Sequence, residues 1–506
     1  RRERSLCICD CNYGGAVATE SLATESSGLA KTTNWWGAFV IGLAGTILVT
    51  GIAPFAVQGM GAAAIFWIGL NTLFGLVLCL CLAEMAVMWP DRHGGVPSYA
   101  QESFTPAIGQ RRAHWLGGFA GWSYWLGWFP VAPINMILAA SYIVALFGLN
   151  TDTKFNLFSV VGGSPISLTV LIISIIGIIG MYLPAHFGLN LGARFATVLG
   201  ILSMLPLTLL IFLPFLKPGS MNWSNIAGFS LPAGVTGSPT FYLGWVFPIT
   251  WSVIAMEAAA CYVGECREPA RDAKIAMTAE GLYGAFIYIM TPLVFVGVLG
   301  AADSLDPLTL YTEFTTKLFG NQPWVQWVIG VPLILALILS VLNAIMGCGR
   351  SLWQASEDRA LPEWFGKVNS HGVPDRAMLF NVICSIIVLF FGSPLAIYIF
   401  SNAGYLFACG LALLGYFVYR HMRPETPRPY RLPTFMKWIA LAIFIFWALV
   451  WTIGGWNAPD IVVAAGSGPT LFLIGIAIML LYIPLHLIRR ASDRKQGIDT
   501  EMTPAL

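Results

Sequence analysis

One acidic residue stands in the middle of a long apolar stretch of this chain. Glu257 lies in the sequence TWSVIAMEAAACYVGECREP, within an apolar run that covers residues 240–263. A carboxylate at the centre of a membrane costs about 3 kcal/mol on insertion scales, so such a residue is a functional candidate. We expect Glu257 to carry a proton or to contact a positive charge. The alternative is a structural hydrogen bond to a neighbouring helix.

A second stretch interrupts an apolar run in a different way. Residues 48–55 read LVTGIAPF, so Thr50, Gly51 and Pro54 fall near the middle of the run 36–60. Glycine lets the backbone leave helical geometry, and proline suits the first turn of a helix that restarts. Unwound backbone survives at this depth only where it lines a cavity or binds something. We expect a broken helix here, or alternatively a simple proline kink.

The two ends of a broken helix suit a zwitterionic ligand. The restarted half offers free N–H groups and a positive dipole end, and the finished half offers free carbonyl groups and a negative end. An amino acid carries the matching pair of charges on one carbon. A second break in the run that holds Glu257 would correspond to the first, as in two inverted repeats of five helices with a site between them.

The composition of the chain indicates where these residues lie. Of its 506 residues, 57% are hydrophobic and 10% are charged, and the mean hydropathy of +0.73 is far above that of a water-soluble globular protein. Apolar runs that reach the length needed to cross a bilayer, about 20 residues, recur along nearly the whole chain. They predict an all-α membrane protein with twelve transmembrane helices, at residues 36–60, 62–88, 116–147, 166–184, 189–214, 240–263, 275–301, 323–352, 377–393, 395–420, 435–456 and 468–488.

The distribution of positive charge predicts the orientation. Of the 27 Lys and Arg residues, all but Lys154, Lys217 and Lys317 fall on one side of the membrane if the helices alternate as counted. The positive-inside rule then places both termini in the cytoplasm, for a multi-pass protein of the plasma (inner) membrane. The net charge of +2 reports this topology and gives no indication of nucleic-acid binding.

Cysteines and sequence motifs argue against several other classes of protein. Cys7, Cys9 and Cys11 form a CxCxC cluster without a paired CxxC or a histidine partner, so we expect a disordered tail and no metal site. The chain contains no HExxH, GxSxG or GxGD motif of a membrane-embedded enzyme. We therefore expect no catalytic residues and no enzyme, and keep a channel as the remaining alternative to a carrier.

Five motifs in order resemble those of the amino acid-polyamine-organocation (APC) transporter superfamily. They are VTGI at 49–52, AEMAVMWPDRHGGVPSYA at 83–100, WSVIAMEAAACYVGECREPARDAKIA at 251–276, SLWQASEDRALPEWFGKVNSHGVPDRA at 351–377 and RPYRLP at 428–433. The resemblance covers roughly residues 36–435. It implies the LeuT-type fold, in which two inverted repeats of five helices and two peripheral helices work by alternating access.

The resemblance also implies a division of the chain. Its parts are a cytoplasmic tail (1–35), a first repeat of helices one to five (36–214), a second repeat of helices six to ten (240–420), helices eleven and twelve (435–488) and a C-terminal tail (489–506).

Substrate-binding residues follow from the resemblance motif by motif. In the first helix, Ile47, Thr50, Gly51 and Ile52 would cradle the carboxylate and the amine of the substrate. In the sixth helix, Trp251, Ser252 and Ile254 resemble the W-S-x-I segment of bacterial arginine/agmatine antiporters of the superfamily, where the Trp closes over the substrate. Asn343 on helix eight is a further candidate, and Glu84 and Pro54 are assigned structural roles within the motifs.

The chain departs from the family pattern at three positions. Val49 and Ala255 stand where the family usually has glycines at the two breaks, and Ser203 stands where many proton-coupled members have a lysine. A serine hydroxyl could help to bind sodium, and Glu257 is the alternative proton site. We therefore expect H⁺ or Na⁺ as a possible coupling ion and no other cofactor.

These expectations amount to a secondary-active transporter of amino acids. The predicted pocket helices supply one mid-membrane carboxylate, Glu257, which is little for a dication. An amino acid with one amine and one carboxylate is therefore preferred as substrate, and the apolar and aromatic lining of helices three and six favours neutral side chains. A polyamine or another amine is the alternative. The bilayer and this small molecule are the expected partners.

Overall fold

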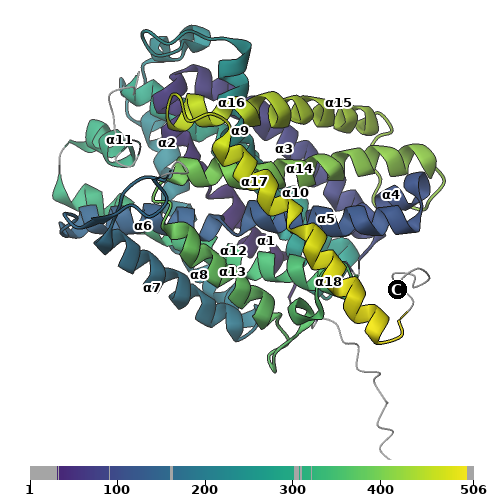
Figure 1. Ribbon diagram of the computed structural model, residues 1–506. Coiled ribbons are helices and arrows are strands. Elements are labelled where there is room, and N and C mark those ends of the chain that lie inside the picture. Colours follow the sequence, from purple (N-terminus) through teal and green to yellow (C-terminus); the bar gives the residue numbers. More distant parts are fainter. Residues whose placement is uncertain are drawn as a thin grey trace, which may run out of the picture.

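The computed structural model describes residues 31, 33–90, 92–159, 163–300, 307, 310–320 and 322–498. Within these residues the chain is almost entirely helical (Figure 1). The cysteine cluster at residues 7–11 and the end of the predicted C-terminal tail, 499–506, lie outside the described residues.

The helices of the first half of the chain are α1 (Trp35–Thr46), α2 (Val49–Met60), α3 (Ala63–Met88), α4 (Ala100–Ile108), α5 (Gln110–Trp128), α6 (Val131–Phe147), α7 (Leu168–His186) and α8 (Leu189–Leu216). Those of the second half are α9 (Pro239–Ile254), α10 (Pro269–Leu299), α11 (Leu310–Phe319), α12 (Pro323–Glu357), α13 (Asp375–Leu389), α14 (Pro394–Met422), α15 (Met436–Leu449), α16 (Gly455–Ala458), α17 (Thr470–Leu480) and α18 (Tyr482–Lys495).

Shorter elements connect these helices. The 3₁₀ segments are η1 (Val96–Tyr99), η3 (Trp223–Asn225), η4 (Ala227–Phe229), η5 (Ala255–Glu265) and η6 (Glu363–Gly366), and the π-helical segments are η7 (Val450–Gly454) and η8 (Pro459–Val463). Strands β1 (Lys154–Phe155) and β2 (Ile166–Ser167) pair antiparallel, with Lys154 opposite Ser167.

Local sequence signals explain where several long helices begin. The Asn34 side chain accepts a hydrogen bond from the Gly37 N–H and starts α1, and Ser238 does the same for the Phe241 N–H at the start of α9. Pro239 occupies the first position of α9, where its missing N–H costs nothing. The same pattern, a serine cap followed by proline, starts α14.

Eleven segments of the described residues are long and apolar enough to cross a membrane. The predicted span at 377–393 is not among them, because α13 has 15 residues, fewer than the roughly 20 that a bilayer needs. The predicted count of twelve is therefore not confirmed. The protein is an integral multi-pass membrane protein, as predicted.

The first and sixth spans lie at the centre of the bundle. In the most apolar 18-residue stretch of each span, 94% of the residues are buried in Trp35–Met60 and 100% in Pro239–Glu265. In Met436–Val463 and in Thr470–Lys495 the share is 33%. Figure 1 shows α1 in the middle of the bundle, with α17 and α18, in yellow, crossing its outside diagonally. Two central broken spans and two peripheral final spans are the arrangement expected from the sequence. The division into two inverted repeats remains a prediction.

Candidate functional site

The first span is interrupted, but earlier than predicted. α1 ends at Thr46 and α2 starts at Val49, so the interruption falls at Ile47 and Leu48. Both residues keep right-handed helical dihedrals, and the turn is tightened by short-range bonds such as that from Thr50 N to the Ile47 oxygen, 2.9 Å. Pro54 lies inside α2, so its predicted place in the first turn of the restarted helix is wrong.

The sixth span changes helix type beside the first interruption. α9 ends at Ile254, and the next 11 residues, which include Glu257, form the 3₁₀ helix η5. Runs of 3₁₀ helix longer than three or four residues are uncommon, and they often mark a hinge or strain. A second interruption in the span of Glu257 is therefore present, as predicted.

Glycines allow the two interrupted spans to pack closely against each other. A side-chain carbon on Gly45 would overlap the carbonyl oxygen of Ala255, and one on Gly42 would lie 2.9 Å from the Ala259 nitrogen. α1 and η5 therefore touch backbone to backbone. Tyr288 of α10 connects the same two spans, because its hydroxyl lies within hydrogen-bonding distance of the Gly45 oxygen (3.1 Å) and the Ser252 oxygen (2.6 Å).

Trp251 lies in a buried aromatic group next to Gly51. Its indole N–H donates to the Gly127 oxygen (3.0 Å), and its ring lies edge-on to Tyr398, with centroids 4.7 Å apart. A side-chain carbon on Gly51 would overlap the hydroxyl oxygen of Tyr398. That hydroxyl is buried without a hydrogen-bond partner among the described residues. The structure thus brings predicted residues of the two breaks together around Tyr398, which the sequence did not single out.

Glu257 is surrounded by donors from two other helices. Its Oε1 accepts hydrogen bonds from Tyr124 (2.8 Å) and Trp128 (3.1 Å) of α5 and from Tyr405 (2.8 Å) of α14. Its Oε2 has no partner within the described part of the chain. Three donors on one oxygen stabilise a negative charge, so Glu257 can hold a carboxylate ready for a cationic group.

A small cavity lies beside the first break. The predicted residues Ile47 and Thr50 line it, together with apolar side chains of α8, α10 and α11. The Thr50 hydroxyl donates to the Ile47 oxygen (2.7 Å). Trp251, Ser252, Ile254 and Asn343 do not line this cavity, so the predicted substrate residues divide between two sides of α1 and α2.

Other predicted site residues are buried and form hydrogen bonds within the protein. The Ser203 hydroxyl donates to the Leu199 oxygen of its own helix (2.6 Å), and Asn343 Oδ1 accepts from the Tyr262 hydroxyl (2.5 Å). The amide nitrogen of Asn343 remains without a partner among the described residues. Ile52 and Ile254 are fully buried in the core.

Two residues of α10 were missed by the sequence analysis. Tyr288 connects the interruptions, and Glu280 is a second fully buried carboxylate, whose Oε2 accepts from the Ala259 N–H (2.8 Å). Glu280 is thus a buried carboxylate in addition to Glu257, the one that the predicted pocket helices supply. The rule applied to Glu257 would have found Glu280, because it too lies in an apolar run, 275–301.

Glu84 anchors one end of the bundle, as its motif suggested. Its carboxylate pairs with Arg420 and Arg428, at 3.1 Å each, and accepts bonds from Tyr416 (3.1 Å) and the Leu432 N–H (2.9 Å). It thereby connects α3 to α14 and to the RPYRLP loop.

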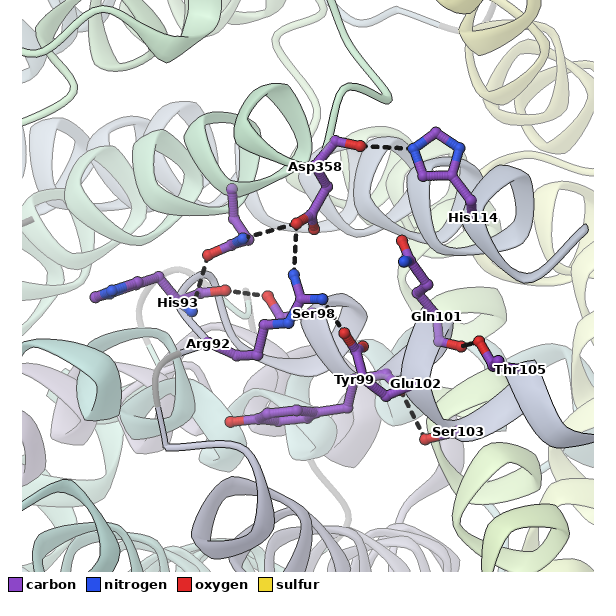
Figure 2. A network of polar contacts seen from close by, with 11 residues as sticks. Arg92, His93, Ser98, Tyr99, Gln101, Glu102, Ser103, Thr105, His114 and Asp358 are labelled. Carbon is purple, nitrogen blue, oxygen red and sulfur yellow. Dashed lines mark hydrogen bonds and ion pairs between the residues drawn. The ribbon is translucent and has the colours of Figure 1, made fainter. Parts of the chain in front are cut away.

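A network of charged residues closes the same end of the bundle, which we call the charged end. Figure 2 shows Arg92 between the carboxylates of Glu102 and Asp358, and Asp358 Oδ1 lies 2.5 Å from Arg92 Nη1. The His93 N–H donates to Gln354 Oε1 (3.1 Å), and the Gln354 amide donates to Asp358 Oδ1 (3.1 Å). The loop that begins at Arg92 is thereby fastened to the end of α12.

This loop covers the space below the Glu257 group. Gly94 and Gly95 have φ values of +83° and +78°, and a side-chain carbon on either would lie 2.8 Å from Ser351 Cα or Cys261 Sγ, respectively. Nearby, the fully buried Arg350 of α12 forms an ion pair with Glu265 at the end of η5, with a second contact of 3.1 Å. The loop thus packs against Cys261 of η5, and the ion pair fixes the end of η5 to α12.

Within the described residues no cluster of three or more His, Cys, Asp or Glu side chains is arranged to hold a metal ion.

A comparison with known families decides the assignment of the chain, because residues 34–482 match the family described as amino acid permease. The chain belongs to the amino acid permease family. The predicted APC membership and the LeuT-type class of the fold are thereby confirmed.

Characterised relatives of this permease are distant in sequence. The chain is 23% identical to the arginine/ornithine antiporter ArcD1 of Lactococcus lactis over 71% of its length and 68% of the relative's. It is 22% identical to the glutamate/serine transporter AimA of Bacillus subtilis over 66% of its length and 60% of the relative's. It is 23% identical to the polyamine transporter PUT1 of Oryza sativa over 75% of its length and 66% of the relative's. The matches thus span less than two thirds of the last two proteins.

Proposed function

We propose that this permease is a secondary-active transporter that moves amino acids across a membrane by alternating access. The observation that carries the proposal is the meeting of two interrupted spans at the centre of the bundle, where α1 and η5 touch. Buried polar atoms without a partner among the described residues lie on the side chains that surround this point, namely Tyr398 Oη, Glu257 Oε2 and Asn343 Nδ2. Such atoms cost free energy when buried alone, and a polar ligand that bonds them recovers it.

The substrate is an amino acid held between Gly51, Trp251 and Tyr398. Its charged groups pair with the backbone at the breaks and with Glu257, and its side chain packs among the aromatic rings. This mode fits relatives that carry arginine, ornithine, glutamate or serine. The protein works in the plasma membrane with both termini in the cytoplasm, so the charged end faces the cytoplasm and is closed in this conformation.

An amine or a polyamine is the second candidate substrate. Two observations favour it: Glu280 adds a second buried carboxylate close to the breaks, and the relative in rice is named a polyamine transporter. A dication would find two negative groups here, where the sequence predicted one.

Thermal stabilisation of the purified protein by each of the twenty amino acids and by common amines tests both candidates. A ligand that binds only the folded protein raises the melting temperature by mass action. Shifts with amino acids support the first proposal, and shifts with amines alone favour the second. Repeating the panel in sodium and in choline buffer tests sodium as the coupling ion.

Uptake of the stabilising ligand into proteoliposomes then separates a carrier from a channel. A carrier shows saturable uptake and exchanges labelled substrate for unlabelled substrate inside the vesicle. Uptake that rises linearly with concentration and shows no exchange would overturn the proposal of alternating access.

A further inference from the structure

Glu280 is a buried carboxylate with one bonded and one unbonded oxygen. Its side chain is fully buried within the long apolar helix α10. Oε2 accepts one hydrogen bond, from the backbone N–H of Ala259 in η5 (2.8 Å), and Oε1 has no partner among the described residues. This is an unusual state for an acidic group inside a membrane protein, since such groups normally pair with a cation or several donors.

The position of this carboxylate is set by the contact between the two broken spans. A side-chain carbon on Gly42 of α1 would lie 2.7 Å from Glu280 Oε1 and 2.9 Å from the Ala259 nitrogen. Only glycine at position 42 leaves room for the carboxylate. Glu280 therefore lies where α1, η5 and α10 meet. Its hydrogen bond from the Ala259 N–H links α10 to η5, the 3₁₀ segment beside the break.

No described cation neutralises Glu280. The titratable groups that interact with it electrostatically are Glu257 and Cys261 on η5, Cys79 on α3 and Tyr288 on α10 itself. The α1 face, WWGAFVIGLAGT, has no titratable side chain. An isolated carboxylate in so apolar a place is costly when ionised, and a bound proton removes this cost.

We propose that Glu280 takes up and releases the proton that couples transport to a pH gradient, an inference that rests on the proposed transport function. While η5 is in place, Glu280 is shut off from water and holds a proton, because burial disfavours the ionised carboxylate. When η5 moves away from α10 to open the site, water reaches the carboxylate and stabilises its charge, so the proton exchanges with the side to which the site is open. The site closes around the neutral, protonated group, so proton binding and the position of η5 are linked reciprocally.

The alternatives identified from the sequence are less suited to this role. Glu257 already accepts hydrogen bonds from three side chains on one oxygen, which fix its carboxyl group beside the proposed substrate site. The Ser203 hydroxyl is bonded to its own helix at Leu199. Glu280 differs from both because its hydrogen bond comes from the backbone of η5, a segment expected to move.

The variant Glu280→Gln tests the proposal in proteoliposomes that contain a pH-sensitive dye. Glutamine keeps an oxygen for the Ala259 N–H but does not titrate. With wild-type protein, a gradient of one pH unit should drive up to about tenfold accumulation per coupled proton, and substrate entry should acidify the lumen. In Glu280→Gln, accumulation and acidification should be lost while exchange of an amino acid substrate, whose proposed site does not include Glu280, stays within about twofold.

Retained proton flux in Glu280→Gln would overturn the inference. Wild-type protein that exchanges substrate without moving protons would do the same. The comparison variant is Glu257→Gln, which should weaken substrate binding instead.

A measurement that needs no substrate separates this inference from the transport proposal. Infrared difference spectra recorded across pH report the carbonyl stretch of a protonated carboxylic acid. A titrating band that is present in wild type and in Glu257→Gln but absent in Glu280→Gln supports the inference even if no substrate has been found. If Glu280→Gln does not fold, Glu280→Asp replaces it: a titrating band that moves or disappears relative to wild type supports the inference, and a band that is unchanged overturns it.

Discussion

The indole ring of Trp251 lies edge-on against the phenol ring of Tyr398, and the hydroxyl of Tyr398 points at the backbone of Gly51. This contact joins α9 to α14 and brings both to the first break. The Tyr398 hydroxyl has no partner within the described residues. A substrate bound at Gly51 would therefore touch both aromatic residues.

Replacing Trp251 by alanine should abolish or severely weaken substrate binding. The change removes the ring that closes over the proposed substrate and its bond to the Gly127 oxygen. Binding is measured by thermal shift and by uptake, and Trp251→Phe serves as the milder control, which keeps a ring. Normal affinity in Trp251→Ala protein would exclude the site assignment.

Gly51→Leu should have the same effect for a steric reason. A carbon at this position overlaps the Tyr398 hydroxyl, so the larger side chain fills the space between them. Combining Gly51→Leu with Tyr398→Phe removes the overlapping oxygen and should restore part of the binding. If the double variant binds no better than Gly51→Leu alone, the clash with Tyr398 is not the cause.

Tyr288→Phe should destabilise the folded protein by about 1–3 kcal/mol, the usual cost of leaving a buried polar group unbonded. The Tyr288 hydroxyl lies within hydrogen-bonding distance of the Gly45 and Ser252 carbonyl oxygens at the two breaks, both in the core of the bundle. Unfolding in detergent measures the loss. Tyr283→Phe is the matched control and should cost less, because among the described residues its hydroxyl bonds only the Thr208 hydroxyl, in a partly exposed place.

Arg92→Ala should open the charged end and expose Cys261. This thiol lies under Gly95 and is 3% exposed, so in the wild-type protein it should react slowly with a maleimide. Loss of the bonds from Arg92 to Glu102 and Asp358 frees the loop, and mass spectrometry should then locate faster labelling at Cys261. Cys409, which is also buried but lies on α14, is the internal control. Equal rates at Cys261 in both proteins would mean that the loop does not act as the closure.

Glu84→Gln should cost about 3 kcal/mol of stability, as is typical when one partner of a buried ion pair is removed. Arg420 and Arg428 would be left without a counter-charge at this site. Chemical unfolding measures the effect, and the exposed pair Glu268–Arg271 is the control, for which Glu268→Gln should change little.

The membrane class, most spans and both breaks could be predicted from apolar runs and family motifs, because these signals are local. The position of the first break could not. Gly51 and Pro54 suggested a point within residues 48–55, yet α1 ends at Thr46, where Gly42 and Gly45 meet η5. That contact joins segments about 200 residues apart, so it cannot be predicted from the pattern of apolar residues within either helix.

The same reason explains what was missed around the carboxylates. Glu257 stood out by its place in the sequence, but its donors Tyr124 and Tyr405 come from helices that lie 133 and 148 residues away. Glu280 could have been found by the same rule, but it lies near the start of its apolar run, only six residues after Lys274 and the other charged residues at the start of α10. Tyr398 carried no signal at all, since one tyrosine in an apolar helix most often packs in the core.

The helix type of η5 has a mechanical consequence. As a 3₁₀ helix its 11 residues span about 22 Å, whereas an α-helix of the same residues spans about 17 Å. Winding this one segment into an α-helix would shorten it by about 5 Å and turn its side chains through different angles. Three contacts lie along this segment: the hydrogen bonds to Glu257, the bond from Ala259 to Glu280, and the ion pair of Glu265 with Arg350. A single change of helix pitch would therefore displace all three at once.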